Sequence, residues 1–269
     1  MSLNSELLRP AESYWNAAAE TYGQVFTDTI VGQIRRKVVW RELERIFKPG
    51  DDVLEINCGT GLDAVFLGTR GVNVAAFDLS PRMIELAQSH SNNVKPFHPP
   101  RFRVLATENL DTLDEGPFDG AFSNFSGLNC VENLSEVGSN LARLLKRGAH
   151  FLICMRGRFV PIEIIWFLAH GRPKRAFSRL LNSRSTCAGN THLTVHQPSV
   201  SRIALQMLPH FRLVRRRGAG ITVPPSYAES LAARFPKAID AFAKIDQRVG
   251  HLPFIRSMAD CVILEFERL

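Results

Sequence analysis

The stretch VLEINCGTGLDA, residues 53–64, combines an acid, Glu55, with two closely spaced glycines, Gly59 and Gly61. The apolar residues before the glycines favour a strand, and the residues after them favour a helix. A strand that passes through a glycine turn into a helix aims backbone N–H groups at a ligand, and in parallel sheets that ligand often carries an adenosine. The stretch therefore predicts a nucleoside-binding turn.

Two acids help to decide which nucleoside cofactor the turn would bind. Asp78 ends a second apolar run about 20 residues after the glycines, where an NAD site places its ribose-binding acid. NAD thus remains compatible with the glycine pattern. Glu55 argues against NAD, because a carboxylate before the turn is of no use to a pyrophosphate. It suits S-adenosylmethionine, which carries a positive ammonium and a positive sulfonium, and we favour this cofactor.

The elements that position these residues alternate between strand and helix. Such alternation predicts an α/β fold with a doubly wound, mostly parallel sheet. Ser80 followed by Pro81 marks a helix start, with the serine as N-cap. We expect strands at residues 53–57, 72–79, 102–107, 118–125 and 149–155, and helices at 62–71, 80–90 and 137–148, the last ending at Gly148.

The flanking segments differ from this core. The apolar spacing before residue 48 is helical, and the pattern of alternation stops after residue 155. A late pair of strands, at 211–217 and 261–269, follows a helix at 198–210 and suggests an antiparallel addition to the sheet. We divide the chain into an N-terminal helical lid (1–47), a cofactor-binding Rossmann-like core (48–155), a helical insertion (156–198) and a C-terminal completion of the sheet (199–269).

Five motifs in order extend beyond the glycine turn: LEINCGTG, FDLSPRMIELA, ATENL, FDGAFSNFSGLNCVENL and LARLLKRGAHFLI. This set resembles the class I S-adenosylmethionine-dependent methyltransferases, in particular their small-molecule branch, over roughly residues 12–155. The resemblance implies a seven-stranded sheet with an antiparallel last strand and an aromatic N-terminal lid. It also implies methyl transfer to a small metabolite, with S-adenosylhomocysteine as the other product, and the apolar stretch of the insertion indicates that this metabolite is partly apolar.

The resemblance implies roles for individual residues. Gly59 and Gly61 would let the backbone approach the methionine end of S-adenosylmethionine. Glu55 would contribute negative charge near the ammonium group of the cofactor. Asp78 would accept hydrogen bonds from the hydroxyl groups of its ribose. Asn57 replaces a glycine of the family pattern, and Ala106 replaces an aspartate. The expected cofactor-binding residues are Tyr14, Tyr22, Glu55, Asn57, Cys58, Gly59, Thr60, Gly61, Asp78, Leu79, Met83, Thr107, Glu108, Asn109, Asn124, Phe125 and Ser126.

A dedicated catalytic residue is harder to identify. In THLTVH, strand alternation places His192, Thr194 and His196 on one face and the apolar residues on the other. His192 or His196 is a weak candidate for a base, and no metal site is expected because no carboxylate or cysteine ligand is near. Methyl transfer from a sulfonium is an in-line displacement with a good leaving group, so positioning alone can accelerate it.

The insertion follows the fifth expected strand, at the edge where open α/β sheets bind ligands. We expect it to serve as the acceptor-binding lid. Trp166 and Phe167 would contact an apolar group, and the cations Arg172, Lys174, Arg175 and Arg179 would meet an anionic one. Two other readings stay open: a helix that simply packs on the sheet, and a basic amphipathic helix at a membrane surface.

Composition and charge limit the function classes. The five cysteines form no CxxC pair, and no run of 18 apolar residues or secretion signal occurs, so we expect free thiols in the cytoplasm and no transmembrane segment. Residues 1–154 hold 15 Lys and Arg against 19 Asp and Glu, while residues 155–269 hold 18 against 7. The basic second half keeps a nucleic-acid methyltransferase open as an alternative, together with a non-catalytic cofactor-binding regulator.

Overall fold

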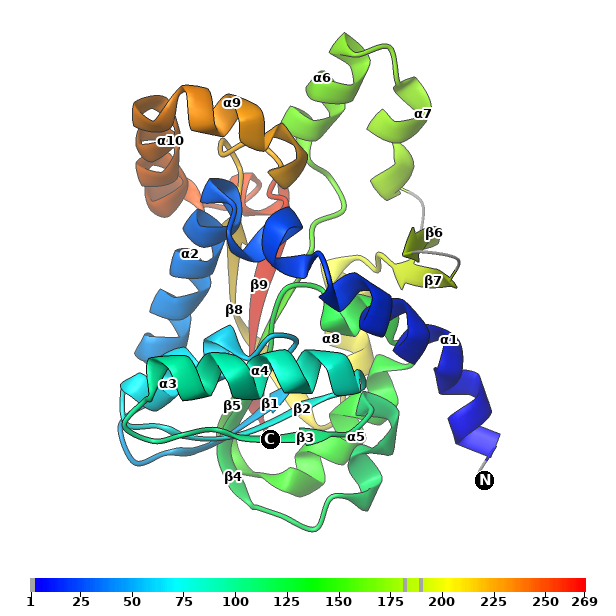
Figure 1. Ribbon diagram of the computed structural model, residues 1–269, viewed down its shortest axis with the longest axis vertical. Helices are drawn as coiled ribbons and strands as arrows, with labels where there is room; N and C mark the ends of the chain where they lie inside the picture. The colour runs from blue at the N-terminus through cyan, green and yellow to red at the C-terminus, as the bar shows by residue number, and fades with distance from the viewer. Residues whose placement is uncertain (1–2, 181–182, 189–190) are drawn as a thin grey trace.

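The computed structural model describes residues 3–180, 183–188 and 191–269, and Figure 1 shows the arrangement of its elements. The side chain of Cys187 lies outside the described part. A seven-stranded sheet forms the centre, with the strand order β3-β2-β1-β4-β5-β9-β8. Its strands are β1 (Asp52–Ile56), β2 (Asn73–Asp78), β3 (Arg101–Val104), β4 (Phe118–Ser123), β5 (Leu145–Arg156), β8 (Phe211–Ala219) and β9 (Cys261–Arg268).

Strand directions follow from how the chain connects the strands. The first five strands are parallel, because helices carry the chain back across the sheet between them. The last strand, β9, returns between β5 and β8 and is antiparallel to both. The doubly wound α/β fold with seven strands and an antiparallel last strand is therefore confirmed.

Helices cover both faces of the sheet, and side-chain alternation along the strands supplies an apolar core on each face. In β1, for example, Val53 faces one core and Leu54 the other. One face carries α2 (Ile30–Ile46), α3 (Leu62–Thr69) and α4 (Pro81–Val94), and the other carries α5 (Leu134–Leu144) and α8 (Val200–Met207). The expected N-cap is confirmed, since Ser80 Oγ accepts from the Met83 N–H at 3.1 Å.

The predicted end of one helix was wrong. The helix expected to continue to Gly148 ends at Leu144, and β5 begins at Leu145. The sequence LKRG has the basic residues and glycine of a helix C-terminus, yet Leu145 is fully buried and pairs with Phe118 of β4. Burial of this leucine in the sheet core outweighs the local helix signal.

The insertion is only partly helical, which corrects the expectation of a helical insertion. It begins with α6 (Pro161–Ala169), α7 (Pro173–Ala176) and η4 (Ser178–Leu180) and ends with a separate hairpin of β6 (Ser183–Ala188) and β7 (Thr191–His196). In β7, Leu193 and Val195 are buried while His192 and Thr194 are exposed, as the alternation predicts. β-Branched residues in this alternating pattern favour a strand.

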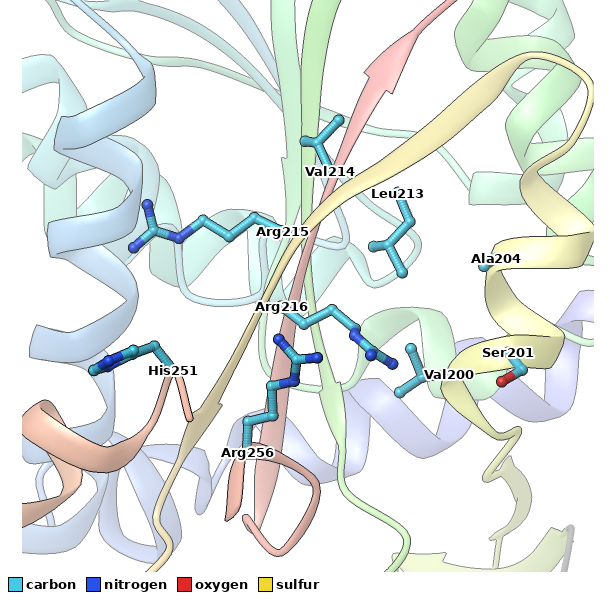
Figure 2. Close-up of a pocket in the computed structure, with 9 residues that line it drawn as sticks. All are labelled: Val200, Ser201, Ala204, Leu213, Val214, Arg215, Arg216, His251 and Arg256. Atoms are coloured by element: carbon cyan, nitrogen blue, oxygen red, sulfur yellow. The ribbon is translucent and has the colours of Figure 1, made fainter. Parts of the chain in front are cut away.

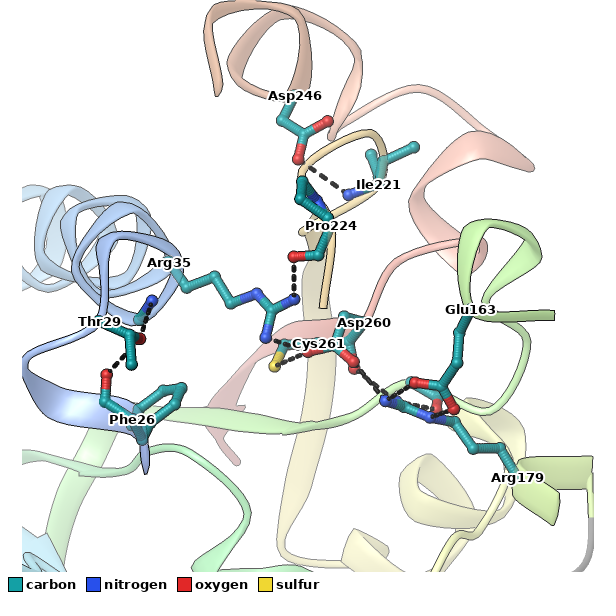
Figure 3. Close-up of polar contacts among 12 residues, drawn as sticks. Phe26, Thr29, Arg35, Glu163, Arg179, Ile221, Pro224, Asp246, Asp260 and Cys261 are labelled. Carbon is teal, nitrogen blue, oxygen red and sulfur yellow. Dashed lines mark hydrogen bonds and ion pairs between the residues drawn. The ribbon is translucent and has the colours of Figure 1, made fainter. Parts of the chain in front are cut away.

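Buried ion pairs fasten the insertion to the rest of the fold (Figure 3). Arg179 of η4 pairs with Glu163 of α6 and with Asp260, and Asp260 also pairs with Arg35 of α2 at 2.6 Å. Burial alone would raise the pKa of Asp260, but the guanidinium groups of Arg35 and Arg179 lower it below its ordinary value. Arg179 thus forms buried ion pairs within the protein, so the structure does not support its expected contact with an anionic group of the acceptor.

The remaining segments lie around the carboxyl ends of the parallel strands or connect β8 to β9. In Figure 1 the N-terminal segment passes over α4 and reaches the β6–β7 hairpin, which it contacts. Within the described residues, no helix is both long and apolar enough to cross a membrane. These segments are α1 (Leu3–Ala19), η1 (Gly23–Thr27), η2 (Thr107–Thr112), η3 (Gly127–Cys130), η5 (Ser226–Ala228), α9 (Glu229–Arg234), α10 (Pro236–Val249) and η6 (Ile255–Ser257).

Candidate functional site

A pocket of about 60 Å³ lies where β1, β2 and β4 end and the N-terminal segment covers them. Carboxyl ends of neighbouring parallel strands are the usual ligand position in such a sheet. The residues that line it are Ala11, Trp15, Tyr22, Asn57, Asp78, Leu79, Met83, Thr107, Glu108, Asn124, Phe125, Gly127, Cys130 and Val131.

The structure brings together many, but not all, of the residues expected to bind the cofactor. Those in the lining come from the N-terminal segment and from four of the five motifs: Tyr22, Asn57, Asp78, Leu79, Met83, Thr107, Glu108, Asn124 and Phe125. The expected residues outside the lining are Tyr14, Glu55, Cys58, Gly59, Thr60, Gly61, Asn109 and Ser126.

The two glycines of the turn meet different constraints. Both have positive φ, +52° at Gly59 and +71° at Gly61, which favours glycine. A Cβ on Gly59 would meet no atom within 4 Å, whereas a Cβ on Gly61 would lie 2.6 Å from the Ala87 Cβ. Gly59 therefore leaves open space beside the turn, and Gly61 permits α4 to pack closely behind it.

Asp78 is the acid closest to the turn. One of its carboxylate oxygens accepts from the Gly59 N–H at 2.8 Å, and the other accepts from the Ser80 N–H at 2.9 Å. Burial raises the pKa of Asp78 to about 6, although these two hydrogen bonds oppose the shift. Each oxygen keeps a second lone pair, so the carboxylate both holds the turn and can accept from a ligand.

Asn57 occupies the position where the family pattern has glycine. Its φ of +58° lies in the left-handed region that asparagine tolerates. Asn57 Nδ2 donates to Thr107 Oγ1 at 2.8 Å, and its Oδ1 accepts from Ser123 Oγ at 3.1 Å. A Cβ on Gly127 would lie 2.3 Å from the Asn57 Cβ, so that position has room only for glycine. Asn57 thus ties together the loops that follow β1, β3 and β4.

A buried polar cluster lies behind the glycine turn. Asp63 accepts from Arg36 Nη1 at 2.6 Å and from Trp40 Nε1 at 2.7 Å, and its other oxygen accepts from Asn124 Nδ2 at 2.9 Å. These bonds fix the Asn124 amide, whose Oδ1 is buried without a partner within the described residues. Sequence reasoning missed Asp63 and Arg36, because only the position of Asp63 in the first turn after Gly61 distinguishes it.

Glu55 lies in the same buried region and does not line the pocket. It is 1% exposed, and its Oε2 is buried without a hydrogen-bond partner in the described part of the chain. Burial, and secondarily the negative charge of Asp63, raises the pKa of Glu55 well above its ordinary value. The structure thus places Glu55 behind the turn, in a setting that favours its neutral form.

The N-terminal segment closes the pocket. Trp15 and Tyr22 line it, while Tyr14 packs against the edge of the Trp15 ring at a centroid distance of 5.1 Å. Asn16 Oδ1 accepts from Ser80 Oγ at 2.6 Å and so holds α1 to the start of α4. The N-terminal segment thus forms one wall of a pocket whose volume is about 60 Å³.

The charge of the lining is one-sided. Asp78 and Glu108 are its ionisable acids, and no Lys, Arg or His is among the described lining residues. Burial raises the pKa of Glu108, that of the Cys130 thiol to about 12 and that of the Tyr22 hydroxyl to about 12. The pocket therefore suits a neutral or positive ligand and offers no cation to a phosphate.

The two histidines considered as bases do not line this pocket. Both belong to β7, where His192 is exposed and His196 half-buried. The His196 carbonyl accepts from Asn129 Nδ2 at 2.7 Å, and Asn129 Oδ1 accepts from the Arg156 N–H at 3.0 Å. Asn129, which sequence reasoning missed, is fully buried and links the loop after β4 to both ends of the insertion.

Comparison with known proteins places these features in context. Residues 54–153 match the family described as "Methyltransferase domain". The chain is 32% identical over 98 residues to a ubiquinone biosynthesis O-methyltransferase of Xanthomonas campestris, covering 36% of this chain and 37% of that protein. It is 26% identical over 175 residues to an uncharacterized protein of Methanocaldococcus jannaschii, covering 65% and 63%. The matches thus span less than two thirds of these relatives.

Solved structures show the same fold. One is a putative S-adenosylmethionine-dependent methyltransferase from Listeria monocytogenes, with a TM-score of 0.55, 16% identity and coverage of 86% of this chain and 97% of that one. Another is the geranyl diphosphate C-methyltransferase of Streptomyces coelicolor in complex with S-adenosyl-L-homocysteine, with a TM-score of 0.54, 17% identity and coverage of 87% and 79%.

Proposed function

Because this chain belongs to the class I S-adenosylmethionine-dependent methyltransferases, we propose that it transfers a methyl group from that cofactor to a small, partly apolar metabolite. The observation that carries the proposal is the charge of the pocket beside the glycine turn. Two acids and no cation line its described part. This arrangement fits a ligand with two positive groups and no phosphate, whereas the pyrophosphate of NAD would find no counter-charge.

The lining offers a partner for each end of the cofactor. Asp78 would accept hydrogen bonds from the ribose hydroxyls, and Leu79 and Met83 would flank the adenine. Thr107 and Glu108 also line the pocket and would contact the polar edge of the adenine. The open side of Gly59 and the unpaired oxygen of Asn124 would face the methionine end. The pocket would thus bind the cofactor mainly through hydrogen-bond acceptors, and the cofactor offers N–H and O–H donors to them.

Catalysis would depend on positioning more than on acid–base chemistry. The bound cofactor supplies a methyl group activated by its sulfonium, which an acceptor attacks in line. Trp15 and Tyr22 would exclude water once the N-terminal segment closes. The high pKa values of Tyr22 and Cys130 keep both side chains neutral near pH 7, so neither acts as a ready base.

We assign acceptor binding to the insertion and retain the proposed division at residues 47, 155 and 198. Asn129 connects both ends of the insertion to the loop that follows β4 beside the pocket. Ile165 is 67% exposed on α6, and Leu168 and Phe177 are exposed close to it in the chain. Such apolar exposure supports an acceptor with apolar character.

The cysteines Cys58, Cys130, Cys154 and Cys261 are free thiols, which supports our proposal that the protein acts in a reducing cytoplasm.

Methyl transfer can be tested with methyl-labelled S-adenosylmethionine. The protein would be incubated with a panel of small phenols and quinols that differ only in the length of an alkyl substituent, and with short RNA and DNA. We expect label in an alkylated acceptor and none when Asp78→Ala replaces the unmodified protein. Asp111→Ala, which changes an exposed aspartate outside the pocket, should transfer normally. Label only in nucleic acid would contradict the proposed acceptor class.

A further inference from the structure

A large cavity lies at the edge of the sheet formed by β8. It measures about 800 Å³ and is open to solvent. Figure 2 shows the residues that line it. A second hollow of about 500 Å³ adjoins it, and the two share Arg216 and Arg256. We call the combined hollow the β8 groove. Since β5 and β9 separate β8 from β4, the groove is distinct from the cofactor pocket.

The chain builds the groove by a close approach of two segments. The Gly218 N–H of β8 donates to the Gly250 carbonyl at 2.7 Å. A Cβ on Gly218 would lie 2.8 Å from the Arg256 carbonyl oxygen, so only glycine allows residues 250–258 to lie against the strand. This contact brings Arg256 next to Arg216, and Figure 2 shows the two guanidinium groups near each other in the groove.

Arg216 and Arg256 differ from their neighbours on β8. Arg212 pairs with Glu267 at 2.8 Å, and Arg217 pairs with Glu42 at 3.3 Å. Neither Arg216 nor Arg256 forms an ion pair with a carboxylate in the described part of the chain. Both are half-buried, and burial together with the charge of Arg256 lowers the pKa of Arg216. Two adjacent cations without a counter-charge are unfavourable unless an anion joins them.

Protection of the sheet edge does not account for this pair. Charged residues on an edge strand discourage pairing with other sheets, and exposed arginines such as Arg212 serve that purpose. Half-buried guanidinium groups that face each other add repulsion without adding exposed charge. Their arrangement instead matches the planar, multiple-donor recognition of phosphate by arginine.

Apolar side chains flank the two arginines. On one side, Val200 and Ala204 of α8 and Leu213 of β8 form the margin of the sheet core. On the other side, Phe159 and Phe254 line the smaller hollow, and Phe254 is 83% exposed with a φ of +66°. An exposed aromatic residue in a disfavoured backbone conformation is often associated with ligand binding.

We propose that Arg216 and Arg256 bind the phosphate group of a phosphorylated amphiphile, whose apolar part lies along the walls of the β8 groove. Two guanidinium groups would donate to the phosphate oxygens, and the apolar walls would remove the ligand's hydrocarbon from water. A free phosphorylated metabolite and the headgroup of an anionic phospholipid share this chemistry. The site is separate from methyl transfer and does not depend on it.

The direct test is calorimetric titration with ethyl phosphate and octyl phosphate. We expect octyl phosphate to bind more tightly, because only its chain reaches the apolar walls. Arg216→Gln and Arg256→Gln should each weaken binding about tenfold or more, the usual effect of losing a charge-assisted hydrogen bond. Arg212→Gln, which removes an exposed cation from the same strand, should leave the affinity unchanged. Thermal melting of each variant checks that it is folded.

The same variants distinguish the two sources of phosphate. Co-sedimentation with phosphatidylcholine vesicles that contain phosphatidylglycerol, lost in Arg216→Gln, would indicate a lipid headgroup. Binding of octyl phosphate without vesicle binding would indicate a free metabolite. Absence of binding to both phosphates and to vesicles would overturn the proposal. So would binding that both arginine variants retain, or equal affinity for ethyl and octyl phosphate.

Discussion

The pocket beside the glycine turn and the β8 groove lie at different places along one sheet and differ in size, exposure and charge. The pocket is small, covered by the N-terminal segment and lined by two acids, whereas the groove is large, open and centred on two arginines. The sequence shows the same division, with a net charge of −4 over residues 1–154 and +11 over residues 155–269. The acids of the pocket and the arginines of the groove have the same signs as the net charges of their halves of the chain.

The two sites also differ in how their charges are held. Asp78 and Asp63 are buried and accept from backbone and side-chain donors, so their loss should affect folding as well as binding, with the larger effect on binding at Asp78 and on folding at Asp63. Arg216 and Arg256 are half-buried at the margin of the core, so their loss should affect binding alone. The predictions below test this difference, from the largest expected effect to the smallest.

Removal of the Asp63 carboxylate should have the largest effect on the stability of the protein. Asp63→Ala leaves Arg36 buried without its partner, and breaking a buried ion pair typically costs about 3–5 kcal/mol. Urea unfolding of the cofactor-free protein measures this change. Asp63→Asn keeps a hydrogen-bond acceptor and should lose less. Equal stability of Asp63→Ala and the unmodified protein would show that the cluster does not support the fold.

Removal of the Asp78 carboxylate should mainly affect binding of the cofactor. Asp78→Ala deletes two charge-assisted acceptors, so the affinity for S-adenosylhomocysteine should fall about a hundredfold or more. Octyl phosphate binding in the β8 groove should be unchanged, because the two sites share no residue. Calorimetry of both ligands on one preparation makes the comparison, and parallel loss of both would indicate a folding defect instead.

The two glycines of the turn should respond differently to alanine. Gly61→Ala must displace Ala87 and Phe102, so it should destabilise the protein by roughly 1–3 kcal/mol. Gly59→Ala meets no atom and should cost about 1 kcal/mol for its positive φ, while weakening cofactor binding. Thermal melting and calorimetry separate the two effects. A larger loss of stability at Gly59 than at Gly61 would contradict the packing described here.

Cofactor binding should depend on pH through Asp78. Its pKa is raised to about 6, so the folded protein protonates this carboxyl as the pH falls through that value. A neutral carboxyl group accepts hydrogen bonds less well, so affinity should be constant above about pH 7 and fall up to about tenfold per unit below pH 6. Asp78→Asn should lose this dependence. An unchanged profile in the variant would assign the titration to another group.

The smallest expected effect concerns the N-terminal segment. Asn16→Ala removes the hydrogen bond from Ser80 Oγ that holds α1 to α4, which is worth about 0.5–1.5 kcal/mol. Because the segment lines the pocket, weaker attachment of α1 should accelerate both association and dissociation of S-adenosylhomocysteine about two- to tenfold. Stopped-flow measurement of Trp15 fluorescence would follow this change. Unaltered rates would indicate that ligand entry does not require opening at α1.

The sequence predicted the sheet well because its evidence is local. Apolar strands, glycine turns and the Ser80 N-cap specify themselves within a few residues, and Asp78 could be located from its distance to the glycines. The early end of α5 and the hairpin in the insertion depend on partners far along the chain, such as Phe118 for Leu145. The residue pattern within one segment does not indicate which distant residues it will contact.

The candidate site shows the same limit. Side chains next to a motif, such as Asn57 and Asn124, were found because the motif located them. Arg36 and Asn129 act through contacts with residues 27 to 67 positions away, and nothing in their own surroundings distinguishes them from ordinary polar residues. The pair of Arg216 and Arg256 likewise appears only when η6 folds back onto β8.

The most direct test of the central claim is calorimetric titration of the unmodified protein at pH 7.5 with S-adenosylmethionine, S-adenosylhomocysteine and NADH. The account predicts binding of the first two and none of NADH, because the described lining of the pocket holds two acids and no cation. Tight binding of NADH without binding of the sulfonium cofactor would contradict it and would identify the glycine turn as a dinucleotide site.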